Sequence, residues 1–364
     1  MSVFYLALIL SLIIGSLIEY WVVKFAYRNR LFDKPNARKL HKEAIPRLGG
    51  LAFAPTLLIV TLLLTLWDSP SGPVSFHVED NMHLLLPLLI TSAIIFALGI
   101  IDDLVGLRYR TKFVGQALAG VVMCAMGIYL TDLHGMFFLN QLPAWLGWII
   151  TIFAIIYVTN AINFVDGIDG LASSLCAITL IYDAVAFVKV KMIIMAVLAI
   201  ILLASLLPFM LMNMFGSSHG RTKTFMGDTG AMFLGLTLTY FGVLLNSETV
   251  AYDYNFNQFV FAFAPLVLPC FDVIRVVAHR VRNHKSPFLA DKNHIHHKFI
   301  ALGLSPHATL AVVFSTAVFL MLAVLWGSIY IDPTLLLILS FIVWMICNYT
   351  LTHLIRKKPK YEKS

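Results

Sequence analysis

The chain has 364 residues, of which 60% are hydrophobic and only 12% are charged, and its formal net charge at pH 7 is +7. Soluble globular domains carry about 25% charged residues, so this composition excludes a soluble globular protein and indicates a chain whose solvent is lipid. The four cysteines all fall inside apolar runs far apart in the sequence, which excludes a disulfide scaffold and a cysteine-based zinc ribbon.

Apolar runs long enough to cross a hydrocarbon core of ~30 Å recur along the whole chain. Because backbone groups in lipid must be satisfied within their own segment, we expect each run to be a helix. Hydropathy predicts about eleven spans, at approximately 3–26, 48–67, 84–101, 113–130, 145–162, 171–188, 192–212, 230–246, 257–278, 308–330 and 334–354. The predicted fold is therefore a single all-α integral membrane domain over residues 1–364, a polytopic bundle of about eleven transmembrane helices.

The basic residues fall in alternate loops, which sets the predicted orientation. They concentrate in the loops 27–47, 102–112, 213–229 and 279–307 and in the tail 355–364, and the loop 163–170 belongs to the same side. The positive-inside rule makes this side cytoplasmic, with the N-terminus outside and the C-terminus inside. The positive charge is thus a topology signal and an attraction to anionic membrane lipid, and it does not indicate nucleic-acid binding.

Two adjacent carboxylates, Asp102 and Asp103, follow the apolar run 84–101 directly. Neighbouring carboxylates repel each other, so we expect a cation beside them: a metal ion, or a basic residue of the following segment such as Lys112. The alternative interpretation is a charged stop at the end of a membrane helix.

A polar stripe ends the predicted span 145–162. Every third residue is polar, so a helix would align these side chains along one face: Asn160, Asn163, Asp166 and Asp169. A hydrogen-bonded seam between helices would explain the two asparagines but not the two carboxylates. The pattern therefore favours a functional stripe that enters the membrane from the cytoplasmic side.

The segment Phe225-Met-Gly-Asp228-Thr-Gly precedes the predicted span 230–246 and lies on the same side. A carboxylate beside a glycine suits Mg²⁺, which takes oxygen ligands and leaves coordination positions open for phosphate oxygens. An aspartate followed by threonine is equally typical of a helix N-cap, so both interpretations of Asp228 stay open at this point.

Three histidines, His294, His296 and His297, lie in the longest cytoplasmic loop. A structural zinc site needs four ligands, and no cysteine or second ligand cluster is near, so zinc is disfavoured. Together with Arg275 and Arg282, these histidines suit the binding of phosphate oxygens. In the first cytoplasmic loop, Lys42 stands near a glycine pair, Gly49-Gly50, that would bring backbone N–H groups to an anion.

Carboxylates for Mg²⁺, basic groups for a diphosphate and a polar stripe beside them together describe phosphoryl transfer, which depends on positioning and charge neutralisation. The main alternative class is a membrane transporter, in which ionisable groups lie near the bilayer midplane and inverted repeats are common. Here Asp183 is a carboxylate well inside a predicted span, but no repeat is visible.

These motifs resemble those of the polyprenyl-phosphate N-acetylhexosamine-1-phosphate transferases. The similar segments are Asp102-Asp103 with Lys112 and Gln116, Asn163-Phe-Val-Asp166-Gly-Ile-Asp169-Gly-Leu-Ala, Phe225-Met-Gly-Asp228-Thr-Gly and His294-Ile-His296-His297, and the resemblance extends from about Asp33 to Leu304. The pattern His-Ile-His-His departs from the three consecutive histidines of the pentapeptide-using branch and is similar to the WecA/TagO branch, which uses UDP-GlcNAc.

The resemblance implies a multi-pass enzyme of the bacterial cytoplasmic (inner) membrane. It would transfer a sugar 1-phosphate, GlcNAc-1-phosphate in the favoured reading, from a UDP-sugar to undecaprenyl phosphate, release UMP, and so start the synthesis of a cell-envelope polysaccharide. The alternative within the family is the phospho-N-acetylmuramoyl-pentapeptide transferase of peptidoglycan synthesis. The implied cofactor is Mg²⁺, with Mn²⁺ as a substitute, and the expected partners are the two substrates, membrane lipid and, as a further candidate, a second copy of the chain.

On this basis we assign candidate site residues. The metal ligand is Asp228, the catalytic candidates are Asp102, Asp103, Asp166 and Asp169, and the substrate-binding candidates are Lys42, Lys112, Asn160, Asn163, Arg275, Arg282, His294, His296 and His297.

A polyprenyl tail must stay in lipid while its phosphate reaches the site, so the implied cleft opens sideways. Pro265 and Pro269 lie inside the predicted span 257–278 and should kink or break that helix. We expect the bent helix to form the lipid-facing wall of this groove.

Overall fold

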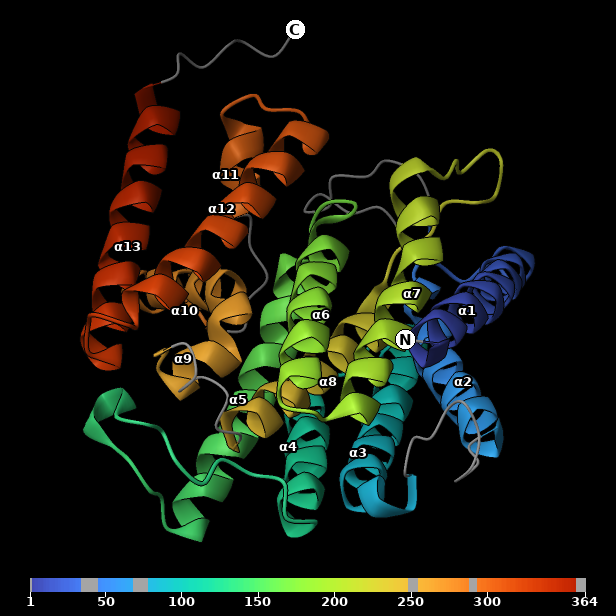
Figure 1. The fold of residues 1–364 in the computed structure, drawn as a ribbon. Coiled ribbons are helices and arrows are strands. Elements are labelled where there is room, and N and C mark those ends of the chain that lie inside the picture. Colours follow the sequence, from blue (N-terminus) through green and yellow to red (C-terminus); the bar gives the residue numbers. More distant parts are fainter. Residues whose placement is uncertain (1, 34–44, 68–77, 248–254, 288–292, 358–364) are drawn as a thin grey trace, which may run out of the picture.

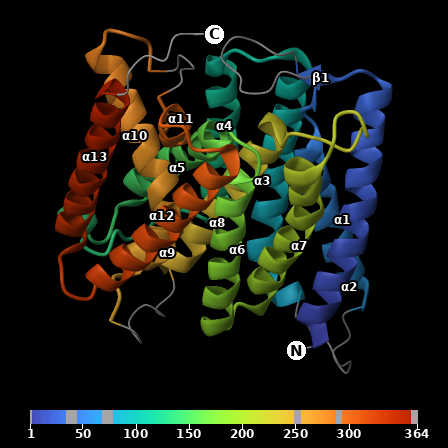
Figure 2. The same ribbon diagram turned by 90° about the horizontal axis from the view of Figure 1, so that it is seen from above.

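The structure is a computed structural model that describes residues 2–33, 45–67, 78–247, 255–287 and 293–357. Long helices run side by side between two faces of the molecule, as Figures 1 and 2 show. In chain order the α-helices are α1 (Ser2–Arg28), α2 (Phe53–Trp67), α3 (Val78–Val105), α4 (Tyr109–Ala125), α5 (Ala144–Val165), α6 (Leu171–Lys189), α7 (Ile193–Phe215), α8 (Gly227–Ser247), α9 (Gln258–Phe263), α10 (Val267–Arg282), α11 (Ile295–Ala301), α12 (Pro306–Gly327) and α13 (Pro333–Lys357).

Short irregular elements connect some of these helices. The strands β1 (Phe32–Asp33) and β2 (Ile45–Pro46) form an antiparallel pair, and the 3-10 turns are η1 (Gly49–Ala52), η2 (Met136–Phe138) and η4 (Ala264–Leu266). The prediction of an all-α polytopic membrane protein is confirmed, because ten helices of the described chain are long and apolar enough to cross a membrane.

The predicted number of eleven spans is not confirmed. The span expected at 113–130 corresponds to α4, which has 17 residues and ends at Ala125. The chain turns there because Gly127 takes a left-handed conformation (φ 90°), a conformation that favours glycine. The segment that follows, up to Pro143, is a loop that contains η2.

The predicted break in the span 257–278 is confirmed. α9 ends at Phe263, the 3-10 turn η4 contains Pro265, and α10 begins at Val267 with Pro269 in its first turn. Proline has no N–H to donate and its ring clashes with the preceding turn, so a continuous α-helix does not form here.

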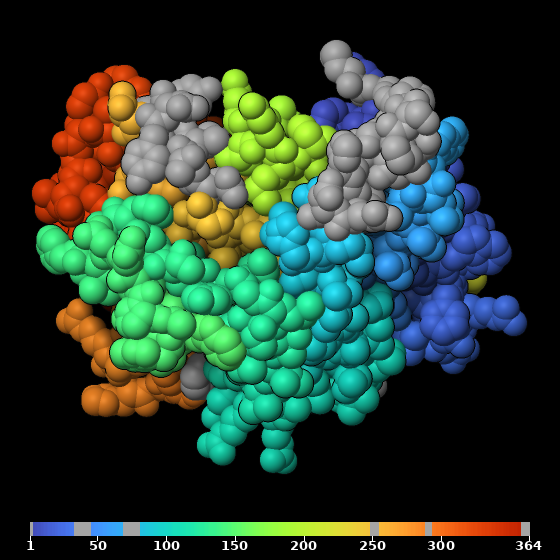
Figure 3. All heavy atoms as spheres, turned by 60° about the horizontal axis from the view of Figure 1, so that its bottom comes forward, coloured from blue at the N-terminus to red at the C-terminus, as the bar shows by residue number. Residues whose placement is uncertain are grey.

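The outer helices present large apolar side chains on their exposed surfaces, as a lipid-facing layer should. Trp21 on α1, Phe153 on α5 and Phe319 on α12 are more than half exposed. In the space-filling view, α1 to α5 form one continuous surface from blue to green (Figure 3). Water would penalise such a surface, whereas hydrocarbon would not.

The centre of the bundle is α8, which is buried from Gly227 to Asn246. It packs against α3, α5 and α6. Its small residues allow this close packing: a Cβ atom on Gly235 would lie only 2.6 Å from the Cα atom of Thr159 on α5. The hydroxyls of Thr237 and Thr239 donate to carbonyl oxygens one turn back in the same helix, so they cost nothing in this dry environment.

The contact between α5 and α8 can be tested by substitution. Gly235→Val should force the two backbones apart and lower the free energy of unfolding by about 1–3 kcal/mol, because overpacking a dense interior strains it. The measurement is thermal unfolding in detergent. The matched control is Gly220→Ala, since a Cβ atom there meets no atom closer than 3.5 Å; equal melting temperatures for the two variants would contradict the close packing.

Candidate functional site

Three of the predicted motifs come together where α3 and α5 end and where α4 and α8 begin. Asp102 and Asp103 lie in the last turn of α3, Lys112 in the first turn of α4, and Asp228 in the first turn of α8. The antiparallel course of neighbouring helices brings these four ends to one face, so residues more than 120 positions apart touch each other.

Asp103 holds the start of α8. Its Oδ1 accepts from the backbone N–H of Asp228 (2.8 Å), and its Oδ2 accepts from the N–H (2.9 Å) and the hydroxyl (2.6 Å) of Thr229. A carboxylate at a helix N-terminus pairs with free N–H groups and with the helix dipole. Asp103 therefore caps α8 from another helix, and the alternative that Asp228 is the cap is wrong.

Gly227 makes this cap possible. Its backbone is left-handed (φ 73°), and a Cβ atom on it would lie 2.7 Å from Asp103 Oδ2 and also collide with the carbonyl oxygen of Arg47. Any side chain at this position would push both the Asp103 cap and the preceding loop away from α8.

The side chain of Asp228 is surrounded by donors. Its Oδ1 accepts from Lys112 Nζ (3.1 Å) and from the carboxamide of Asn163, and its Oδ2 pairs with Arg47 Nη2 (3.3 Å). Lys112 also forms an ion pair with Asp102, whose Oδ1 accepts from the N–H of Leu107. Lys112 is thus the cation expected beside the aspartate pair, and it bridges Asp102 to Asp228.

Arg47 was not among the predicted site residues. The backbone around it pairs with the segment before α8: the N–H groups of Gly49 and Gly50 donate to the carbonyl oxygens of Phe225 and Met226. The two glycines thus bind backbone carbonyls of the protein, not an anion, and this pairing delivers the Arg47 guanidinium to Asp228. Lys42, the candidate from the same loop, lies outside the described residues.

The predicted polar stripe follows the helix only in part. Asn160 donates to Gln116 Oε1 (2.8 Å), and Asn163, one turn later, reaches Asp228. α5 then ends at Val165, so the expected alignment of all four residues on one helical face is wrong for Asp169. The carboxylate of Asp169 pairs instead with Lys223 Nζ (2.6 Å).

Asp166 caps the end of α5 and carries the least compensated negative charge at this face. Burial, together with the neighbouring carboxylates of Asp169, Asp228 and Asp103, raises the pKa of its carboxyl group to about 7, although Arg47 opposes this shift. Four carboxylates so close together would be stabilised by an added cation.

The segment 293–297, which carries the three histidines and is called the histidine loop below, is attached to α10. His294 Nδ1 lies 2.7 Å from Asp272 Oδ2, and Arg275 donates to Asp272 Oδ1 and to the carbonyl oxygen of Asn293. Asp272 was missed from the sequence; its position one helical turn before Arg275 was the available signal. Arg282, by contrast, is exposed at the last turn of α10.

This loop touches the end of α5, and so it adjoins the aspartate cluster. The ring centroid of His294 lies 5.7 Å from that of Phe164, and the ring of His296 fills the space beside Gly167. Both ring nitrogens of His296 are buried without a partner in the described chain. Burial, together with the neighbouring His297 and His294, lowers the pKa of His296 to about 3, so the ring is neutral.

Lys298 follows the histidines in the sequence, but its ammonium group binds α13. Its ammonium donates to the carbonyl oxygen and the side chain of Asn348 and to the hydroxyl of Thr352. All three of its donors are therefore used, and Lys298 fixes α11 to α13.

The carboxylates of this cluster supply the oxygen ligands that a magnesium ion needs. Among the described residues, no three Asp, Glu, His or Cys side chains converge on one point, so there is no all-protein metal cage. Mg²⁺ is usually held by one or two carboxylates, with water and phosphate oxygens completing the shell. The surplus negative charge at Asp166, close to Asp228, fits an ion of this kind.

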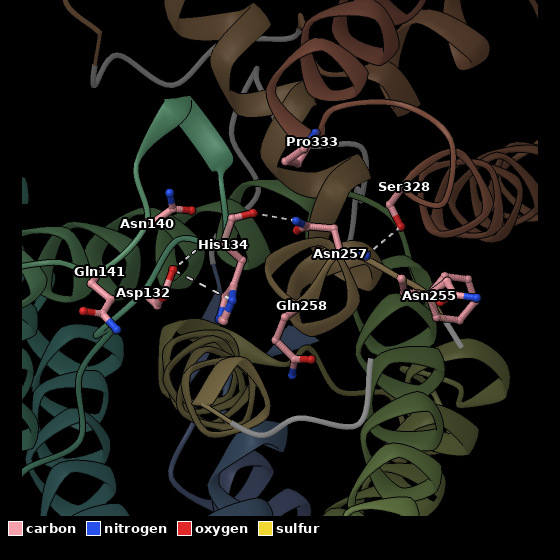
Figure 4. Close-up of a pocket in the computed structure, with 10 residues that line it drawn as sticks. Asp132, His134, Asn140, Gln141, Asn255, Asn257, Gln258, Ser328 and Pro333 are labelled. Carbon is pink, nitrogen blue, oxygen red and sulfur yellow. Dashed lines mark hydrogen bonds and ion pairs between the residues drawn. The ribbon is translucent and has the colours of Figure 1, made fainter. Parts of the chain in front are cut away.

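A second polar hollow lies at the other end of α8. It has a volume of about 860 Å³ and is lined by Asp132, His134, Asn140, Gln141, Asn255, Phe256, Asn257, Gln258, Ser328 and Pro333. Figure 4 shows His134 between Asp132 and Asn257; His134 also contacts the carbonyl oxygen of Asn246, near the end of α8. Many of these polar groups hydrogen-bond to one another, so the residues that line the hollow hold the surrounding loops together.

Comparison with known proteins places the chain among transferases. The family model described as Glycosyl transferase family 4 matches residues 85–246. The chain is 30% identical over 354 residues, 96% of its length and 92% of the relative, to the undecaprenyl-phosphate alpha-N-acetylglucosaminyl 1-phosphate transferase of Haemophilus influenzae.

Two further relatives have similar names. The probable undecaprenyl-phosphate N-acetylglucosaminyl 1-phosphate transferase of Bacillus subtilis is 29% identical over 357 residues, covering 97% of this chain and 93% of the relative. The decaprenyl-phosphate N-acetylglucosaminephosphotransferase of Mycolicibacterium smegmatis is 28% identical over 315 residues, covering 81% and 74%.

The raised pKa of Asp166 has a consequence for stability. The folded state holds its proton up to about pH 7, whereas the unfolded state loses it near pH 4, so folding stability should fall as the pH rises through this range. In metal-free protein, the melting temperature should therefore be lower at pH 8 than at pH 5. Asp166→Asn should raise the pH 8 value by about 2–4 °C.

The matched control for this measurement is Asp332→Asn. Asp332 accepts from the N–H of Thr334 in the turn before α13, and asparagine can make the same bond. This variant should retain the wild-type pH dependence. A drop from pH 5 to pH 8 in Asp166→Asn as large as in the wild type would contradict the electrostatic account.

Proposed function

The chain belongs to glycosyl transferase family 4, and on that premise we propose that it transfers N-acetylglucosamine 1-phosphate from UDP-GlcNAc to undecaprenyl phosphate and releases UMP. The relatives described above carry this activity in their names and are matched over most of both chains. The observation that carries the proposal is the cluster in which Lys112, Arg47 and Asn163 surround Asp228. The histidine pattern and the names of these relatives favour UDP-GlcNAc as the donor.

The two cations are the groups that we propose to receive phosphate oxygens. Lys112 contacts Oδ1 of Asp228 and Arg47 contacts Oδ2, and Arg47 is partly exposed. A diphosphate that enters beside Asp228 would share these cations with the carboxylate, at little cost in reorganisation. Phosphoryl transfer needs such fixed positive charge more than it needs covalent chemistry from the protein.

Mg²⁺, or Mn²⁺ in its place, would be held by Asp228 with Asp166. Bound there, the ion would neutralise the charge of the donor diphosphate. The protein side of this arrangement depends on Asp103, because the Asp103 cap fixes the backbone from which the Asp228 side chain projects. We therefore assign Asp103 to positioning, and Asp102 to holding Lys112 and the proton of the lipid phosphate.

The histidine loop supplies the other wall of the site. Arg275 and His294 are held by Asp272, and His296 lies against Gly167, next to Asp166. We assign His294 and His296, with His297 beside them, to the sugar and diphosphate of the donor. The break between α9 and α10 would form the side on which the polyprenyl chain enters from lipid.

The reaction should be measured with membranes that contain the protein, labelled UDP-GlcNAc, undecaprenyl phosphate and Mg²⁺. Label should move into organic-extractable lipid, UMP should be released, and chelation should stop the reaction until Mg²⁺ or Mn²⁺ is restored. Asp228→Ala should lower kcat by at least about 100-fold, because it removes a preorganised charge. His134→Gln, at the other end of α8, should retain wild-type activity.

Full activity in correctly inserted Asp228→Ala would overturn the metal and phosphate assignment. Transfer of label from UDP-MurNAc-pentapeptide instead of UDP-GlcNAc would keep the site but change the donor.

The site should face the cytoplasm of the bacterial inner membrane, with the N-terminus outside. In a variant that lacks the four native cysteines, His219→Cys, in the exposed loop before α8, should react with a membrane-impermeant maleimide only after cells are opened. Phe138→Cys, which lies in η2 and is 81% exposed, should react in intact spheroplasts. The reverse labelling pattern would invert the topology.

A further inference from the structure

Asp272 is a buried carboxylate on α10. Its hydrogen-bond partners lie in the histidine loop and in α10, to which the loop is attached. It has no exposed surface. Its Oδ1 accepts from Arg275 Nη2 (2.8 Å) and from the N–H of Ile295 (3.2 Å), and its Oδ2 faces His294 Nδ1 (2.7 Å). A carboxylate so completely used by the protein is not available to a ligand.

The partners of Asp272 fix both the position and the rotation of His294. Residues 293–295 are tied to α10 through Asp272 and through Arg275, which donates to the carbonyl oxygen of Asn293. The His294 ring lies next to Phe164 and nearly parallel to the ring of His296, at an interplanar angle of 8°. Its second nitrogen, Nε2, has no hydrogen-bond partner in the described part of the chain.

A carboxylate accepts hydrogen bonds and does not donate them, so the nitrogen that faces Asp272 must carry a proton. In the neutral imidazole, Nε2 is then left with a lone pair, and it can only accept. Asp272 thereby determines that Nε2, on the other side of the ring, is a hydrogen-bond acceptor. The His294 ring lies beside His296, whose ring fills the space next to Gly167 and so adjoins Asp166, which places this part of the loop next to the aspartate cluster.

We infer that Asp272 is a positioning residue, which holds His294 with its proton on Nδ1 so that Nε2 accepts a hydrogen bond from a protonated oxygen of a substrate. That oxygen is a hydroxyl of the donor sugar or the P–OH of the lipid phosphate. The inference rests on the proposed function, since it concerns the substrates of that same site.

The sharpest variant is Asp272→Asn, which preserves shape. Its carboxamide oxygen can still accept from Arg275 and Ile295, but its NH₂ group would face His294 Nδ1. Nδ1 would then have to accept, the proton would move to Nε2, and the substrate would meet a donor instead of an acceptor. We expect kcat/KM, measured on the folded protein, to fall by about 10–100-fold. Asp272→Glu, which restores a carboxylate, should recover part of this loss.

A double-mutant cycle separates positioning from general support of the loop. If Asp272 acts through His294, then Asp272→Asn combined with His294→Gln should be no worse than His294→Gln alone. Losses that multiply would overturn the inference. Asp183→Asn is the matched control, because Asp183 is a buried carboxylate on α6 that makes no hydrogen bond to these residues, and it should keep wild-type activity.

The substrate that supplies the oxygen is identified by which kinetic constant moves. A higher KM for UDP-GlcNAc alone assigns the sugar hydroxyl, and a higher KM for undecaprenyl phosphate alone assigns the P–OH group. Equal kinetic constants for Asp272→Asn and wild type would overturn the inference.

The tautomer can be read without any turnover. In ¹⁵N-histidine-labelled protein, the His294 signals, assigned by their loss in His294→Gln, should show Nδ1–H in the wild type and Nε2–H in Asp272→Asn. This measurement keeps the two ideas apart. An inactive wild type with the expected tautomers would sink the proposed function and keep the Asp272 assignment, whereas Nε2–H in the wild type would sink the latter.

Discussion

The geometry of the whole site depends on how the N-terminus of α8 is satisfied. A helix begins with N–H groups that have no partner in the helix, and α8 begins in the dry interior of the bundle, where such groups are costly. Asp103 supplies the partner from the end of α3. The same contact locks α3 to α8 and fixes the rotation of the first turn, so the Asp228 side chain must project between Lys112, Asn163 and Arg47.

Charge balance explains why so many ionisable groups can share this place. Asp102 and Asp228 are each paired with Lys112, Arg47 adds a second cation, and Asp169 is neutralised by Lys223. Asp103 uses backbone and hydroxyl donors instead of a cation. Burial and repulsion by the neighbouring carboxylates raise the pKa of Asp166, which indicates that its negative charge is poorly compensated. Five carboxylates thus share this face with three cations, so the site carries a surplus of negative charge.

Much of this could be predicted from the sequence, because hydropathy and charge are local properties. The spans, the shared face of the motifs and the break at Pro265 follow from composition and from the missing N–H of proline. The extent of α4 and the last residue of α5 were predicted less well, because hydropathy marks an apolar run but not the residue at which its helix ends. Arg47 and Asp272 were missed for another reason: Asp228, the partner of Arg47, lies 181 residues away, and His294, which gives Asp272 its place in the site, lies 22 residues away.

The fully buried course of α8 also explains why the two ends of the molecule differ. Between Asp228 and Asn246 the helix offers threonines that bond to their own backbone and glycines that let α5 approach, and no Asp, Glu, Lys, Arg or His interrupts its length of about 27 Å. Polar chemistry is therefore confined to its ends. At the second end, amide groups bond mainly to loops of the protein. At the first end, cations and carboxylates pair directly with one another, and the histidine loop, held by Asp272, adjoins them from the side of α10.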